Sequence, residues 1–116
     1  MTEVNPKINA VITELYDFGK KSIAELNSSS PFAGVPFLLK DLDVQLAGTP
    51  FGGGTNLLKN YVSEKTSDVV SKIIESGLIV FGKTNVPEFG ITPYTEPMEH
   101  IQSTRHITLA SMQKYS

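Results

Sequence analysis

Gly34-Val35-Pro36-Phe37-Leu38-Leu39-Lys40-Asp41 is the stretch from which the fold of this 116-residue chain can be worked out. Gly and Pro open an uninterrupted apolar run, which predicts a short strand buried on both faces. The run ends on Lys40, which either extends into solvent and pairs with Asp41 or Asp43, or lies desolvated beside a polar cluster. Because desolvation lowers the pKa of a lysine, the second arrangement would let Lys40 act as a base.

A second buried strand is predicted at 78–81, where Leu-Ile-Val-Phe is followed by Gly-Lys-Thr-Asn. Apolar residues recur at helical spacing over 66–76, and Gly77 ends that helix. Strand, helix and strand form a βαβ unit with parallel strands. Lys40 and Lys83 then come to the same carboxyl edge of the sheet, where open α/β sheets bind ligands. We therefore expect both lysines at the rim of one crevice.

The region before this unit is predicted to be a single amphipathic helix. Asn5-Pro6 is a typical helix start, and apolar residues then recur every three or four positions as far as Leu26, with Gly19 as a weak point. The glycine-rich segment 47–55 is predicted to be a loop lining a cleft, because it matches neither common phosphate-binding glycine motif.

Composition restricts the class of protein. A formal net charge of −2 gives no electrostatic reason to expect nucleic acid or an anionic membrane as a partner. Cysteine is absent, and neither a signal-peptide pattern nor a membrane-spanning apolar run is found, so we expect a cytoplasmic protein. No cofactor or metal site is expected, since His100 and His106 are six residues apart and fit no common ligand spacing.

Five blocks of the sequence have a characteristic order and spacing: Asn5 to Ile12, Pro31 to Asp41, Ala47-Gly48, Ser76 to Asn85 and Glu88-Phe89. Together these blocks resemble the amino-terminal part of the amidase signature family. The similarity covers residues 5–97 and implies an α/β fold of which this chain is an amino-terminal fragment, about a fifth of a full member, with a helix followed by the βαβ unit. The Thr95-Glu96-Pro97 ending looks most like general amidases and 6-aminohexanoate cyclic-dimer hydrolases.

The resemblance also implies a mechanism. Family members hydrolyse carboxylic amides with a Ser–cis-Ser–Lys triad, and the lysine of the first block falls on Lys40. That lysine accepts a proton through the bridging serine, which relays it from the nucleophilic serine. Lys83 matches the second block, and we assign it a structural or rim role.

The chain departs from the family pattern after Pro97. The family's serines lie in a Gly- and Ser-rich segment whose amides form the oxyanion hole, whereas residues 98–116 contain no glycine. Ser103, Ser111 and Ser116 lack flanking glycines, so no nucleophile can be carried over. We therefore expect a partial amidase signature domain at 1–97 and an aberrant, poorly ordered, irregular tail at 98–116, as a frameshift after codon 97 would produce.

This departure predicts a truncated amidase that is inactive alone, because a base without a nucleophile has nothing to activate. The alternatives are a non-catalytic binding or regulatory module and a functionless gene remnant. Small sheets with unpaired edges are marginally stable, so we also expect self-association or a complementing polypeptide as partner. The substrate expected for the intact family is a small-molecule amide.

Overall fold

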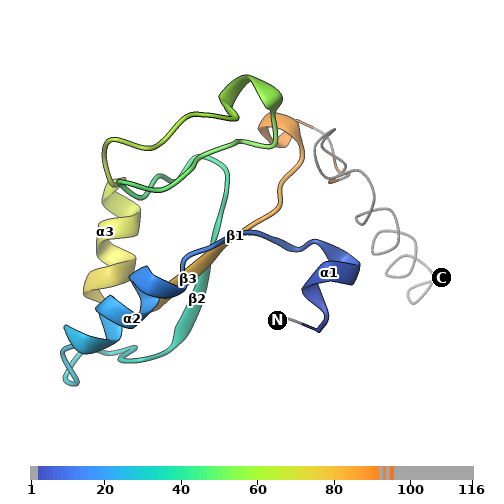
Figure 1. Ribbon diagram of the computed structural model, residues 1–116. Coiled ribbons are helices and arrows are strands. Elements are labelled where there is room, and N and C mark those ends of the chain that lie inside the picture. The colour runs from blue at the N-terminus through green and yellow to red at the C-terminus, as the bar shows by residue number, and fades with distance from the viewer. Residues whose placement is uncertain (1–2, 92, 94, 96–116) are drawn as a thin grey trace.

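A three-stranded sheet forms the centre of the computed structural model, which describes residues 3–91, 93 and 95 (Figure 1). Its strands are β1 (Val11–Glu14), β2 (Pro36–Lys40) and β3 (Ile79–Thr84), in the order β1-β3-β2. β2 pairs with β3 in parallel, and β1 pairs with β3 antiparallel. The α/β class expected from the sequence is confirmed.

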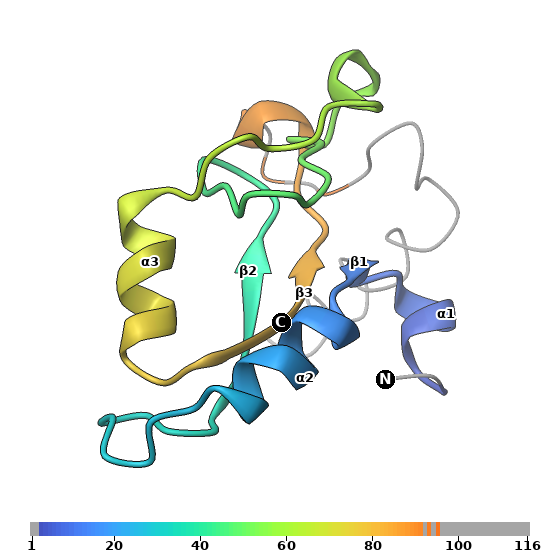
Figure 2. The ribbon, with the colours of Figure 1, turned by 60° about the vertical axis from the view of Figure 1, so that its left-hand side comes forward.

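The βαβ unit is confirmed as well. Helix α3 (Asp68–Glu75) lies between the parallel strands β2 and β3 in the chain, and Figure 2 shows it beside β2. Val70, on its apolar stripe, is fully buried in a core cluster with Leu39, Leu46 and Val80. The helix thus covers the sheet with the stripe that its spacing predicted.

The prediction of a single amino-terminal helix is wrong. The structure has α1 (Asn5–Ile8), then β1, then α2 (Tyr16–Ala24). Asn9 ends α1 in the left-handed region, with φ 45°, and the Asn5 side chain then holds Val11 through two hydrogen bonds of 2.8 Å. Val11-Ile12-Thr13 is β-branched throughout, and pairing with β3 outweighs its weak helical preference.

Helix α2 packs on β3 at a glycine. A Cβ on Gly19 would lie 3.3 Å from the carbonyl oxygen of Val80 and 3.6 Å from Ile79 Cγ2, so the helix backbone approaches the strand closely. The residue that weakened the helix prediction therefore permits the contact between α2 and the sheet.

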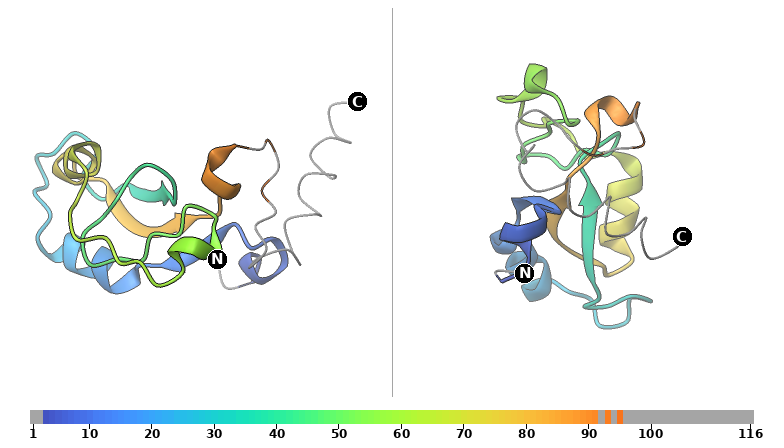
Figure 3. Two further views of the ribbon diagram at one scale, coloured as in Figure 1. Left: turned by 90° about the horizontal axis from the view of Figure 1, so that it is seen from above. Right: turned by 90° about the vertical axis from the view of Figure 1, so that its right-hand side faces the viewer.

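The segment from Asp41 to Ser67 arches over the ends to which β2 and β3 point (Figure 2). It contains the short helix η1 (Asn56–Leu58), which both views of Figure 3 show at the end of the loop farthest from α3. A bridge between Pro50 and Val62 joins its two halves. A second short helix, η2 (Glu88–Gly90), follows β3.

None of the helices described here has the length and apolar character that crossing a membrane would require. The predicted domain boundary at Pro97 and the predicted tail at 98–116 lie outside the described residues.

Candidate active site

Lys40 and Lys83 both lie at the carboxyl edge of the sheet, but on opposite faces. Lys40 pairs with Thr84 in the β2–β3 register, whereas Lys83 pairs with Leu39. Residues that pair across neighbouring strands lie on the same face of the sheet, so Lys83 shares a face with Leu39. Because side chains alternate between faces along a strand, Lys40 lies on the opposite face. Lys40 is exposed and Lys83 is 0% exposed. The expected common edge is confirmed, and the expected common crevice is wrong.

Lys83 is enclosed by the loop that follows β2. Its Nζ donates a hydrogen bond to the carbonyl oxygen of Pro50 and lies 3.6 Å from Asp41 Oδ1. The same Nζ is 5.8 Å from the centroid of the Phe51 ring, within the range of a cation–π contact. Carbonyl, carboxylate and ring together compensate in part for the loss of water around this ammonium group.

Asp41 joins the end of β2 to the loop. It is 2% exposed, and its Oδ2 accepts a hydrogen bond of 2.9 Å from the amide of Gly52. Its own amide donates to the carbonyl oxygen of Thr84 at 3.3 Å. Asp41 thus forms its ion pair with Lys83. The pairing of Lys40 with Asp41, one of the two that the sequence allowed at the end of the strand, is not formed.

Burial dominates the electrostatics of this pair. Burial raises the pKa of Asp41, although the amide of Gly52 and the charge of Lys83 oppose the rise. Burial likewise lowers the pKa of Lys83, and the Asp41 carboxylate opposes that change. A buried lysine with a lowered pKa is the usual signature of a base. Here, however, the Nζ of Lys83 is enclosed, whereas Lys40 at the same edge of the sheet is exposed.

The glycine-rich loop brings its backbone close to other segments. A Cβ on Gly54 would lie 2.7 Å from the carbonyl oxygen of Val86, and the carbonyl of Gly53 accepts a hydrogen bond of 2.8 Å from the amide of Phe89. The loop therefore fastens the segment after β3 to the segment after β2, at the same edge as Lys40.

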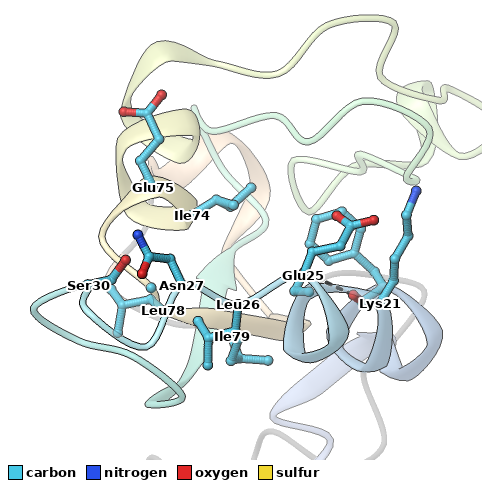
Figure 4. A pocket seen from close by; sticks show the side chains of 12 residues that line it. Lys21, Glu25, Leu26, Asn27, Ser30, Ile74, Glu75, Leu78 and Ile79 are labelled. Atoms are coloured by element: carbon cyan, nitrogen blue, oxygen red, sulfur yellow. Dashed lines mark hydrogen bonds between the residues drawn. The ribbon is translucent and has the colours of Figure 1, made fainter.

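A hollow between α2 and α3 lies at the other end of the sheet (Figure 4). Its lining includes Lys21 and Glu25 of α2, Glu75 of α3 and the start of β3 at Ile79. Because β2 and β3 run away from this end, the hollow is remote from Lys40.

Within the residues that the structure describes, no three His, Cys, Asp or Glu side chains come together as a metal site. The two histidines and the serines at 103, 111 and 116 lie outside that range. Sequence reasoning missed the Lys83–Asp41 pair. The sequence held part of the information. Lys40 and Asp41 are consecutive, so their side chains point to opposite faces of the sheet if the strand geometry continues past Lys40.

Comparison with known proteins gives a consistent result. A family model described as Amidase matches residues 1–106. A 6-aminohexanoate-cyclic-dimer hydrolase from Paenarthrobacter ureafaciens is 41% identical over 96 residues, which cover 81% of this chain and 19% of that protein. A lipoamidase from Enterococcus faecalis is 38% identical over 87 residues, which cover 74% of this chain and 12% of that protein.

The fold agrees with these relatives. The solved structure of a 6-aminohexanoate cyclic dimer hydrolase complexed with substrate superposes with a TM-score of 0.80 at 37% identity, over 85% of this chain and 20% of that one. The chain thus spans about a fifth of the length of the hydrolases that it matches. The sequence blocks, the βαβ unit that carries Lys40 and these matches together show that the chain belongs to the amidase signature family, whose members hydrolyse amides.

Proposed function

We propose that this chain forms the lysine-bearing part of an amidase active site, with Lys40 as the catalytic base and a carboxylic amide as substrate. The observation that carries the proposal is the position of Lys40 at the carboxyl end of β2, exposed between two residues, Leu39 and Asp41, that are each 2% exposed. The backbone around Lys40 is thereby held while its side chain stays accessible.

In this proposal Lys40 accepts a proton from a bridging serine, which in turn takes it from the serine that attacks the amide carbonyl. A lysine can accept a proton only when its charged form is disfavoured, which requires removal from water. Lys40 is exposed in this chain. The remaining part of an amidase active site would therefore have to cover the face of the sheet on which Lys40 lies.

We further propose that the 116-residue polypeptide does not hydrolyse amides by itself. Its sequence holds no Gly- and Ser-rich segment of the family type, so the nucleophile, the bridging serine and the oxyanion hole would have to come from elsewhere. Removing a single oxyanion donor already costs about 10²–10³-fold in rate. The division into a partial domain at 1–97 and an aberrant tail at 98–116 belongs to the same proposal.

A cytoplasmic location stays a prediction from the sequence.

The proposed partner is a polypeptide that supplies the missing part, with self-association as the competing outcome. Among the described strands β2 is at an edge of the sheet, because the order is β1-β3-β2. Apolar side chains are also exposed beside the sheet, including Ile23 at 58% and Val69 at 50%. An open strand edge flanked by apolar surface favours pairing with further strands.

The test of Lys40 is a chimera in which residues 1–97 replace the matching fifth of a 6-aminohexanoate-cyclic-dimer hydrolase. We expect the chimera to hydrolyse the cyclic dimer, and Lys40→Ala to lower kcat by about 10²–10⁴-fold. Lys72→Ala, which removes an exposed lysine on α3, is the matched control. A Lys40→Ala chimera as active as the Lys72→Ala chimera would refute the assignment.

The predicted inactivity is tested on the unmodified chain. Ammonia release from a simple aliphatic amide should not exceed that of a buffer blank. Hydrolysis that Lys40→Ala abolishes would show that the chain is a complete enzyme and would overturn this part of the proposal.

A further inference from the structure

We infer that Lys83 is a positioning residue for Lys40, acting through Asp41, an inference that rests on the proposed function. The two lysines do not share a cleft. They are nevertheless joined by a short path, from the Nζ of Lys83 to the carboxylate of Asp41 and through the backbone to the neighbouring Lys40.

Asp41, the middle of this path, is held from three sides. Its carboxylate faces Lys83 Nζ at 3.6 Å and receives the Gly52 amide at 2.9 Å, and its own amide donates to Thr84 at 3.3 Å. The three partners come from β3 and from the loop, so Asp41 cannot rotate without breaking contacts to two separate segments.

The direction of Lys40 follows from its two neighbours. Leu39, on the other side, lies in the core cluster and is 2% exposed. A residue between two fixed neighbours on an extended strand has its Cα–Cβ bond directed to one face. Lys40 therefore points away from the face that buries Leu39 and Lys83, and only its side-chain torsions remain free.

The Lys83–Asp41 pair as a whole matters for geometry more than for stability, although removing one partner alone leaves a buried charge unpaired. A buried ion pair is weak support for stability, because well-packed apolar residues of similar volume are often as stabilising or more so. An apolar residue in place of Lys83 could fill the space beside Phe51, but it would neither hold Asp41 nor donate to the carbonyl of Pro50. The pair accordingly specifies geometry at the end of β2, and the loop at Gly52 is fixed with it.

Distances in the full chain test this inference. The sequence has no cysteine, so cysteines introduced in pairs can be spin-labelled selectively. The reporter pair is Lys40→Cys with Val69→Cys, and the control pair is Ile23→Cys with Val69→Cys, which joins α2 to α3 at exposed positions. Pulsed electron paramagnetic resonance then gives one distance distribution for each pair.

We expect Lys83→Met to broaden or shift the 40–69 distribution while the 23–69 distribution keeps its width. Lys83→Arg, which retains the charge and hydrogen-bond donors, should restore much of the narrow 40–69 distribution. Two results would overturn the inference. Equal broadening of the 40–69 and 23–69 distributions would indicate a merely structural role for Lys83. An unchanged 40–69 distribution in a folded variant would indicate that Lys83 has no role in placing residue 40.

Asp41→Asn is the second variant, in case Lys83→Met does not fold. It keeps the side-chain shape but removes the carboxylate charge, and the same selective change at 40–69 is expected. Loss of the folded state in both variants would count against positioning and in favour of a stability role. Because no step of the experiment measures hydrolysis, failure of Lys40 as the base would leave its outcome unaffected.

Discussion

Lys83 Nζ lies 3.6 Å from Asp41 Oδ1, and the two side chains are buried beneath a loop that both of them bind. The sequence neighbour of Asp41 is the exposed Lys40. Two lysines at the same sheet edge thus have different environments, because Lys83 is buried inside the fold and Lys40 is exposed.

Lys83→Met should lower the free energy of unfolding by about 3–5 kcal/mol, because it leaves the Asp41 carboxylate buried without its partner. Urea titration followed by circular dichroism measures the change. Lys72→Met, at an exposed position, should alter stability by no more than about 0.5 kcal/mol. The double variant Lys83→Met/Asp41→Leu should recover much of the loss. A double variant less stable than Lys83→Met would contradict this account.

The pH dependence of stability should carry the signature of Asp41. Because burial raises its pKa above the ordinary value of 3.8, the native state binds more protons than the unfolded state between these two pKa values. The unfolding free energy contributed by Asp41 therefore falls as pH rises through that interval. Asp41→Asn should abolish this part of the slope.

Asp43→Asn is the matched control for the slope, since Asp43 is exposed and its φ of 62° is one that asparagine tolerates. At the basic end, Lys83 has a lowered pKa, so the unfolded state binds more protons between that pKa and 10.5. Stability from this group should rise with pH over that range. If the unfolding free energy of Asp41→Asn still fell with pH over the acidic range, the fall would have to come from other carboxylates.

Gly77→Ala should cost more stability than Gly48→Ala. Both glycines have positive φ, +92° and +74°, so each alanine carries a conformational penalty of about 1–2 kcal/mol. A Cβ at Gly77 would also lie 2.8 Å from Ser30 Cβ and 2.9 Å from the Ala33 backbone, whereas nothing lies within 4 Å at Gly48. Overpacking adds about 1–3 kcal/mol at Gly77 alone. If thermal unfolding showed equal losses of stability in the two variants, the turn at 30–33 would have to move to accommodate the methyl group.

Asn5→Ala should destabilise the start of the chain by about 1–3 kcal/mol, since each of its two hydrogen bonds to Val11 contributes about 0.5–1.5 kcal/mol. Amide hydrogen exchange should locate the loss at Val11 and its neighbours in β1. Asn60→Ala, at an exposed position, is the control. Unchanged protection at Val11 would mean that pairing with β3 holds β1 without the asparagine.

The βαβ unit was predictable because its signals are local and mutually consistent. The apolar run of β2, the stripe of α3 and the glycine after it each indicate one element, and parallel pairing follows from their order. The division of the amino-terminal region was not predictable from periodicity. Val11 and Ile12 fit a helical stripe and a strand equally well, and only the distant partner β3 distinguishes them.

The candidate site was predictable in part. The edge of the sheet at which Lys40 and Lys83 lie follows from topology alone. Alternation along the strand also separates Lys40 from Asp41, but which of the two shares a face with Lys83 depends on register. A shift in pairing between Phe37 and Leu38 changes that register by one residue, and no local pattern reports such an irregularity.

The order of the strands in the sheet has a consequence for synthesis. Among the described strands, β3 is the last in the chain and the middle one in the sheet, and both β1 and β2 hydrogen-bond to it. A nascent chain that has not reached Ile79 therefore holds two strands with no partner to pair with. Neither of these two strand pairings can form until β3, as far as Thr84, has left the ribosome.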